Sequence, residues 1–123
     1  FCDAAGVPVP SEYQGQSILP LLDGITNNDR QDIFCMYHGN QFGLYSQRMI
    51  RDRQWKYIWN ATAEDELYDT QNDPGELNNL AIDSTKQSEL QRLRLRLVSW
   101  MESTQDPLLN PWIRAQLIEG LKR

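Results

Sequence analysis

The single histidine of the chain is the first candidate for chemistry. His38 lies in Tyr37-His38-Gly39-Asn40, at the end of a short apolar run and just before a glycine-containing loop. Such loops often carry binding residues. An imidazole can donate to an anionic or hydroxylated ligand, or take part in acid–base chemistry. A histidine that is only hydrogen-bonded within a turn fits the same sequence, so both interpretations stay open.

The other reactive residues do not form a complete catalytic set. Cys2 and Cys35 have neither a second cysteine nor a histidine at metal-finger spacing, so we expect two buried free thiols. Six carboxylates lie between residues 64 and 76, but they lack the alternate spacing of a calcium loop. Turn formation and helix capping explain these carboxylates better. The sequence also contains no P-loop, G-x-S-x-G or G-x-G-x-x-G motif.

Length and charge limit the class of protein. The 123 residues are 40% hydrophobic and 24% charged, as in a globular domain. No apolar run approaches the ~20 residues that a membrane span needs. Twelve basic and seventeen acidic residues give a net charge of −5, which argues against nucleic acid as the main partner. The arginines between residues 48 and 53 and between 92 and 96 could form a basic face, although a solvated surface is the simpler interpretation.

Four short segments have the apolar and aromatic pattern of strands: residues 33–37, 44–51, 55–59 and 66–69. Asp52-Arg53-Gln54 has the right length for a hairpin turn between the second and third of them. Short connections throughout predict an antiparallel meander. A long helix on one face of this sheet would give an α+β fold.

A long helix is predicted after the last strand. Pro74 and Gly75 turn the chain away from the sheet. Residues 83–85 then offer N-cap oxygens, with Gln87 three positions after a serine as in a capping box. Leucines at helical spacing predict a helix over about residues 85–103, even though some of them alternate with arginines as in a strand. Residues 112–121 are a candidate for a last helix.

The first residues are typical of the end of a helix. Phe1–Ala5 are followed by Gly6, which suits a helix C-terminus, and then by two prolines. A short apolar patch, residues 18–22, predicts one helical turn further on. A chain that begins at the tail of a helix is expected to be a fragment of a larger protein.

An ordered series of motifs resembles the C-terminal region of sulfatases. The motifs are CDAAGVPVP (2–10), GQSILPLL (15–22), RMIRDRQWKYI (48–58), ELYD (66–69), NDPGE (72–76) and NLA (79–81). Each motif is short, and the resemblance depends on their order and separations. It covers about residues 1–103.

The resemblance implies an alkaline-phosphatase-like catalytic domain ahead of this sheet and helix. Sulfatases, including the arylsulfatases, are sulfuric ester hydrolases; their nucleophile is a formylglycine in a C/S-x-P-x-R motif, and their large domain holds calcium or magnesium. Neither Cys2 nor Cys35 stands in that motif, so we expect no catalytic or metal-binding residue here and no activity of this chain alone. Residues 1–31 would be the tail end of the catalytic domain and a connecting loop, 32–103 the C-terminal subdomain and 104–123 an extension.

In such a protein the C-terminal subdomain packs against the catalytic domain and can lend side chains to the rim of the substrate pocket. His38 is the predicted rim residue, with Asn40 and Gln41 as weaker candidates. Arg48 is predicted to form a structural ion pair rather than to bind sulfate. The expected partners are the catalytic domain and a sulfated substrate of carbohydrate type, and an uncovered apolar face would favour self-association. A periplasmic or secreted location follows from the resemblance alone.

Two alternatives stay open. A phosphonate or phosphodiester hydrolase of the same superfamily would differ in its upstream nucleophile and substrate preference. A non-catalytic carbohydrate-binding module is suggested by Trp55, Tyr57 and Trp59, which alternate and so share one sheet face. Burial under the long helix is the commoner fate of such a face.

Overall fold

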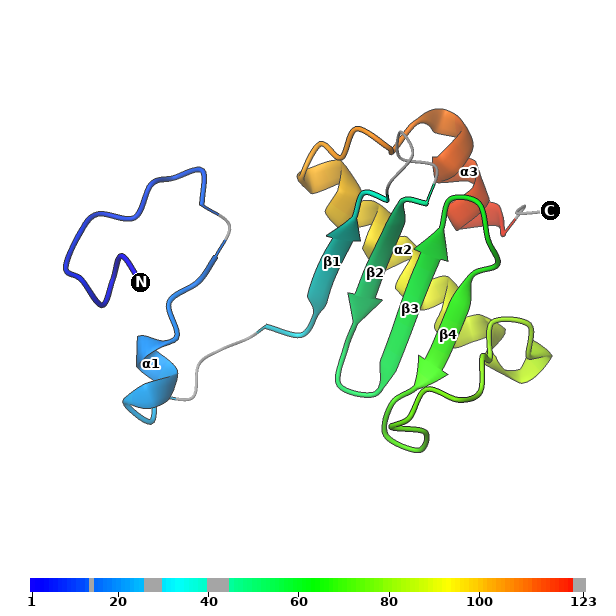
Figure 1. Cartoon of the computed structure of the whole chain (residues 1–123), viewed down its shortest axis with the longest axis horizontal. Coiled ribbons are helices and arrows are strands. Elements are labelled where there is room, and N and C mark those ends of the chain that lie inside the picture. The colour runs from blue at the N-terminus through cyan, green and yellow to red at the C-terminus, as the bar shows by residue number, and fades with distance from the viewer. Residues whose placement is uncertain (14, 26–29, 40–44, 121–123) are drawn as a thin grey trace. The chain divides into compact units, whose positions relative to one another are not determined.

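The structure, a computed structural model, describes residues 1–13, 15–25, 30–39 and 45–120. The chain forms two compact units, Phe1–Arg30 and Gln31–Arg123. The first contains α1 (Leu19–Leu22). The second contains, in chain order, β1 (Ile33–Tyr37), β2 (Gln47–Arg51), β3 (Trp55–Asn60), β4 (Glu66–Asp69), the 3-10 turn η1 (Ser84–Lys86), α2 (Gln87–Ser103) and α3 (Pro111–Glu119), as labelled in Figure 1.

The first unit opens with a hydrogen-bonded turn of the kind that closes a helix. The backbone N–H of Gly6 donates to the carbonyl of Asp3 at 3.1 Å, and that of Val7 donates to Cys2 at 3.0 Å. This pair of bonds is how a helix ends on a left-handed residue. Gly6 has a φ of +67°, a conformation that glycine adopts without a steric penalty.

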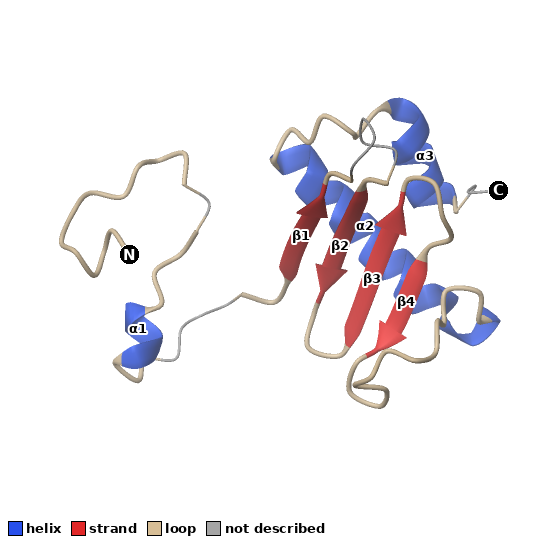
Figure 2. Ribbon diagram, in the orientation of Figure 1, coloured by secondary structure: helices blue, strands red, loops and turns tan. Residues whose placement is uncertain are grey.

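The second unit contains the predicted antiparallel sheet, in the order β1-β2-β3-β4. The register sets Phe34 opposite Ile50, Ile50 opposite Tyr57, and Tyr57 opposite Leu67. This row of four side chains belongs to the hydrophobic core, since α2 lies across this face of the sheet (Figure 2). Each strand therefore alternates between a face that packs on α2 and an open face.

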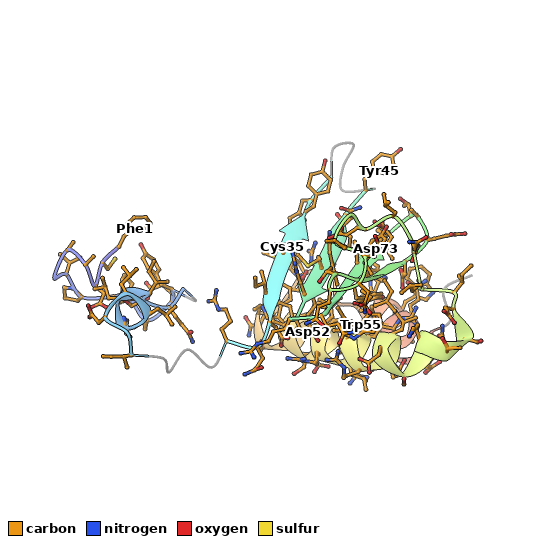
Figure 3. The ribbon with its side chains drawn as sticks, turned by 90° about the horizontal axis from the view of Figure 1, so that it is seen from below. Phe1, Cys35, Tyr45, Asp52, Trp55 and Asp73 are labelled. Carbon is orange, nitrogen blue, oxygen red and sulfur yellow. The ribbon has the colours of Figure 1, made fainter. Side chains whose placement is uncertain are left out.

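The aromatic residues of β3 are part of this core. Trp55, Tyr57 and Trp59 are 7%, 0% and 1% exposed. Figure 3 shows Trp55 between the sheet and α2. The three rings share one face, as predicted, but the helix covers that face. The idea that they form a sugar-stacking surface is therefore wrong.

The side chains of α2 settle the conflict between helical and strand patterns. Leu93 and Leu97 are fully buried, whereas Leu95 between them is 47% exposed. That difference is expected from a helical period, because residues two apart lie on different faces. The N-terminal capping differs in detail from the prediction. The Asp83 side chain accepts from the backbone N–H of Thr85 at 2.8 Å. Gln87 does not form the predicted capping box, because its side chain donates to the carbonyls of Ala81 and Asp83.

The predicted last helix is α3, and it completes the core. The Asn110 side chain caps it by accepting from the backbone N–H of Ile113 at 2.9 Å. Ile113 and Leu117 are buried against the rest of the core. The helix ends before Gly120, whose φ of +69° closes it. In the described part of the chain, no helix has the length and apolar character needed to cross a membrane.

Candidate functional site

The site that the sequence predicts lies at the end of β1. His38 directly follows this strand and is exposed. The backbone of Gly39 lies against Tyr45. A Cβ atom at position 39 would be 2.6 Å from the Cβ of Tyr45, so only glycine fits there. Figure 3 shows Tyr45 projecting on the side away from α2. Asn40 and Gln41, the weaker candidates, lie outside the described residues.

A buried ion pair lies beside this strand end. Arg48 on β2 donates through Nε to Asp106 Oδ2 at 2.5 Å and through Nη2 to Asp106 Oδ1 at 2.9 Å. Both side chains are fully buried. The guanidinium also donates to the carbonyls of Gln47 at 2.8 Å and Tyr37 at 3.5 Å. The prediction that Arg48 makes a structural ion pair is confirmed, so Arg48 is not free to bind sulfate.

The charge of Asp106 links this pair to His38. Burial alone would raise the pKa of the Asp106 carboxyl, but hydrogen bonds from Arg48 and the backbone N–H of Leu108 hold that pKa below its usual value of 3.8. A positive charge on His38 lowers it further. Within the described part of the chain, no hydrogen bond fixes the imidazole of His38. The strand end therefore combines an exposed imidazole with a buried, charge-neutral ion pair nearby.

A second buried polar cluster lies below the β3–β4 connection. The hydroxyl of Tyr57 donates to Asp65 Oδ2 at 2.6 Å, and Arg94 on α2 donates to the same oxygen at 3.0 Å. Burial and the nearby carboxylate raise the pKa of Tyr57 well above its usual value. The three side chains satisfy one another, so this cluster is structural and offers no reactive group.

The arginines of α2 are used in the same way. Arg92, Arg94 and Arg96 form ion pairs with Asp52, Asp65 and Asp32, respectively. Arg92 also binds Glu89 at 2.9 Å. These ion pairs neutralise the arginines between residues 92 and 96, which were one of the two candidates for a basic face. The helix thereby supports the sheet instead of presenting a surface for anions.

The described cysteines and carboxylates do not come together as a metal-binding site. Both thiols are free, as predicted, but Cys2 is half-buried and Cys35 is exposed, so the expected burial is wrong. Cys35 is exposed because it lies on the open face of the sheet. Among the residues that the structure describes, no three His, Cys, Asp or Glu side chains could hold a metal ion. These residues therefore do not fit the calcium or magnesium ion that the resemblance implies.

The open face of the sheet carries an apolar row. Cys35, Met49 and Ile58 lie opposite one another on β1, β2 and β3. Ile33 and Tyr37, on the same face of β1, are 52% and 51% exposed. An apolar row of this kind on a sheet face suits contact with another protein surface.

Comparison with known proteins identifies the family. Residues 1–103 match the family described as N-sulphoglucosamine sulphohydrolase, C-terminal. The chain belongs to this sulfatase family. It is 32% identical over 109 residues to a Delta 4,5-hexuronate-2-O-sulfatase of Bacteroides thetaiotaomicron, covering 86% of this chain and 23% of that protein. It is 29% identical over 150 residues to an ulvan-active sulfatase of Formosa agariphila, covering 96% and 30%.

Solved sulfatases share the fold. A 2-O GAG sulfatase superposes with a TM-score of 0.75 at 31% identity, over 85% of this chain and 23% of that one. A phosphonate monoester hydrolase of Agrobacterium radiobacter superposes with a TM-score of 0.72 at 25% identity, over 83% and 23%. The chain spans 56% of a Haemophilus influenzae relative and 30% or less of the named sulfatases. It corresponds to the C-terminal subdomain of this family.

Sequence reasoning missed the partners of the buried charges. Asp106 lies beyond the motifs of the resemblance, in a segment that looked like an extension. Only general rules could have pointed to these partners: a buried arginine needs a carboxylate, and a buried tyrosine hydroxyl needs a hydrogen-bond acceptor. Neither rule says which carboxylate is used, because Asp106 is 58 positions from Arg48.

Proposed function

We propose that the whole protein hydrolyses sulfate esters and that this chain supports its catalytic domain. The family match over residues 1–103 carries the proposal. The named relatives include sulfatases from bacteria and arylsulfatase K from mammals. The nucleophile, a formylglycine, and the calcium or magnesium ion would come from the catalytic domain, since the described residues here do not fit a metal site.

The proposed substrate is a sulfated carbohydrate. The names of several relatives refer to sulfated sugars: ulvan, a hexuronate and N-acetylglucosamine. One solved neighbour, with a TM-score of 0.74, was determined in complex with D-glucosamine-2-N,6-O-disulfate. Release of sulfate from such a saccharide by the whole protein is the direct test. The isolated 123-residue chain is expected to release none, and turnover by it would refute that part of the proposal.

Within this enzyme, His38 is proposed to touch the substrate at the rim of the pocket. The support is its exposure, its position at a strand end and the absence of a hydrogen bond to its ring in the described part of the chain. Asn40 and Gln41 follow in the same segment and are proposed as weaker contacts. A contact with the leaving-group side would affect substrate binding more than the chemical step.

The variant His38→Ala tests the rim role. We expect KM for a sulfated saccharide to rise roughly tenfold, the effect of losing about 1.4 kcal/mol of binding, with kcat nearly unchanged. Ser99→Ala, an exposed polar position on α2, is the matched control and should behave as wild type. An unchanged KM in His38→Ala would remove His38 from the substrate site without affecting the sulfatase assignment.

The alternative activity is hydrolysis of a phosphonate ester or a phosphodiester. The phosphonate monoester hydrolase has nearly the same TM-score as the sulfatases. The fold of this chain therefore does not distinguish hydrolysis of a sulfate ester from hydrolysis of a phosphonate ester. Parallel assays of the whole protein with a sulfate and a phosphonate monoester of one alcohol decide between them, and a higher kcat/KM for the phosphonate would overturn the sulfatase proposal.

The open sheet face is proposed to contact the catalytic domain. When this chain is isolated, the apolar row of Cys35, Met49 and Ile58 would be uncovered, and we expect self-association. Sedimentation of the isolated chain tests this, and a clean monomer across the concentration range would contradict it. A periplasmic or secreted location is part of the same proposal, and cell fractionation with detection of the whole protein tests it.

A further inference from the structure

A groove lies away from the strand end of His38. It is bounded by the β3–β4 connection, the first half of α2 and α3. In Figure 1, the β3–β4 connection and α3 lie at the upper right, and α2 passes behind the sheet. Its volume is about 800 Å³, and its walls include Ile82, Arg94, Trp112 and Gln116. All of these residues are in the described part of the chain.

The floor of the groove holds an unsatisfied acceptor. Gln116 is only 9% exposed, and its Oε1 atom is fully buried with no hydrogen-bond partner. Buried polar side-chain atoms are nearly always hydrogen-bonded, and an unpaired one is unfavourable. Gln116 lines the groove, so a rotation of its amide toward the groove would bring this oxygen within reach of a ligand that carries an O–H or N–H donor.

One wall of the groove is an exposed indole. Trp112 is 65% exposed, whereas Trp55 and Trp59 are buried and Trp100 stacks on Phe34. An indole presents a large flat apolar face together with an N–H donor. Ile82, which is 89% exposed, adds a second apolar surface to the same groove. This combination suits a flat ring with apolar C–H faces and polar edges.

The charge of the groove restricts the ligand further. Arg94 is already bound to Asp65 and Tyr57, so its positive charge is neutralised. Glu64, on the rim, is exposed and has no cationic partner within the described residues. Among the described residues that line the groove, the net charge is therefore negative, and it opposes binding of a sulfate group.

We propose that this groove binds a neutral sugar ring, at a site separate from the one that hydrolyses sulfate. The ring stacks on Trp112, a hydroxyl or amide group donates to Gln116 Oε1, and Glu64 accepts from a further hydroxyl at the rim. This site would hold unsulfated units of a saccharide. It does not depend on the proposed sulfatase activity, because none of its residues belongs to the predicted rim.

Calorimetric titration of the full-length protein with the neutral disaccharide of N-acetylglucosamine tests the proposal. We expect saturable binding that inorganic sulfate does not displace, since sulfate would compete only at a catalytic pocket. Trp112→Ala should weaken binding roughly tenfold, equivalent to about 1.4 kcal/mol, while Trp112→Phe retains most of the affinity. Tyr13→Ala, which removes an aromatic ring that is 61% exposed in the first unit, should bind as wild type.

Gln116→Leu separates a binding role from a structural one. Replacing an unpaired buried amide by an apolar side chain of similar size should leave the melting temperature unchanged or higher. The same variant should bind the disaccharide several-fold more weakly. Absence of saturable binding to the wild-type protein, displacement by sulfate, or wild-type affinity in Trp112→Ala would each overturn the proposal. Loss of sulfate release in an assay would leave it intact.

Discussion

Replacing Asp106 by asparagine removes the negative partner of a fully buried charge. In the wild-type protein, Arg48 makes two hydrogen bonds to Asp106, and neither side chain is exposed. In Asp106→Asn, the guanidinium would keep the carbonyl of Gln47 at 2.8 Å and the weak contact with Tyr37 at 3.5 Å. Breaking a buried ion pair by removing one partner costs about 3–5 kcal/mol, because the remaining charge is uncompensated. We expect that loss in the free energy of unfolding.

Denaturant unfolding of the two proteins measures the effect, and the melting temperature should fall by at least roughly 10 °C. Glu102→Gln is the matched control, because Glu102 pairs with Arg114 at 2.9 Å on the surface, where the two side chains are 48% and 53% exposed. That pair should be worth less than about 1 kcal/mol. The double variant Arg48→Met/Asp106→Leu should recover much of the loss. Equal effects of Asp106→Asn and Glu102→Gln would refute the reasoning.

Three further predictions concern stability. The pKa values of Asp52 and Asp106 lie below 3.8 in the folded chain, so their ionised forms stabilise the fold above about pH 4. Unfolding experiments should show this contribution lost as the pH falls further. A free energy of unfolding that stays constant from pH 4 to 2 would contradict this. Leu97→Ala should cost about 2–5 kcal/mol by leaving a cavity, whereas Leu95→Ala, at a position 47% exposed, should cost far less in the same denaturant titration. Asn110→Ala should cost about 1 kcal/mol through loss of the cap of α3, and a thermal melt identical to wild type would count against that cap.

Local sequence patterns were sufficient for most of the elements. The bounds of β1 and β4 agree with the predicted segments, because apolar and aromatic residues bordered by turn formers define short strands. β2 begins at Gln47 rather than at 44, since Tyr45 lies against Gly39 and is not paired in the sheet. The helix over 85–103 starts as a 3-10 turn and becomes α-helical at Gln87. Such differences at the ends reflect local capping geometry.

The functional predictions depended on contacts that no local pattern specifies. His38 could be singled out because it is the only histidine and ends a strand. The pairing of Arg48 with Asp106 could not be found, because it joins positions 58 residues apart. The groove likewise combines Glu64 and Trp112, which belong to the β3–β4 connection and α3. Contacts of this kind depend on how α2 and α3 close over the sheet.

The distance in sequence between Arg48 and Asp106 has a consequence for folding during synthesis. Arg48 leaves the ribosome with β2, whereas its counter-ion follows only after the whole of α2 has been made. At the usual elongation rate of ~5–20 residues per second, the 58 residues from Met49 through Asp106 take several seconds to add. During that interval the sheet cannot bury this arginine without leaving its charge unpaired. Closure of the sheet against α2 is therefore expected to wait for the segment that carries Asp106.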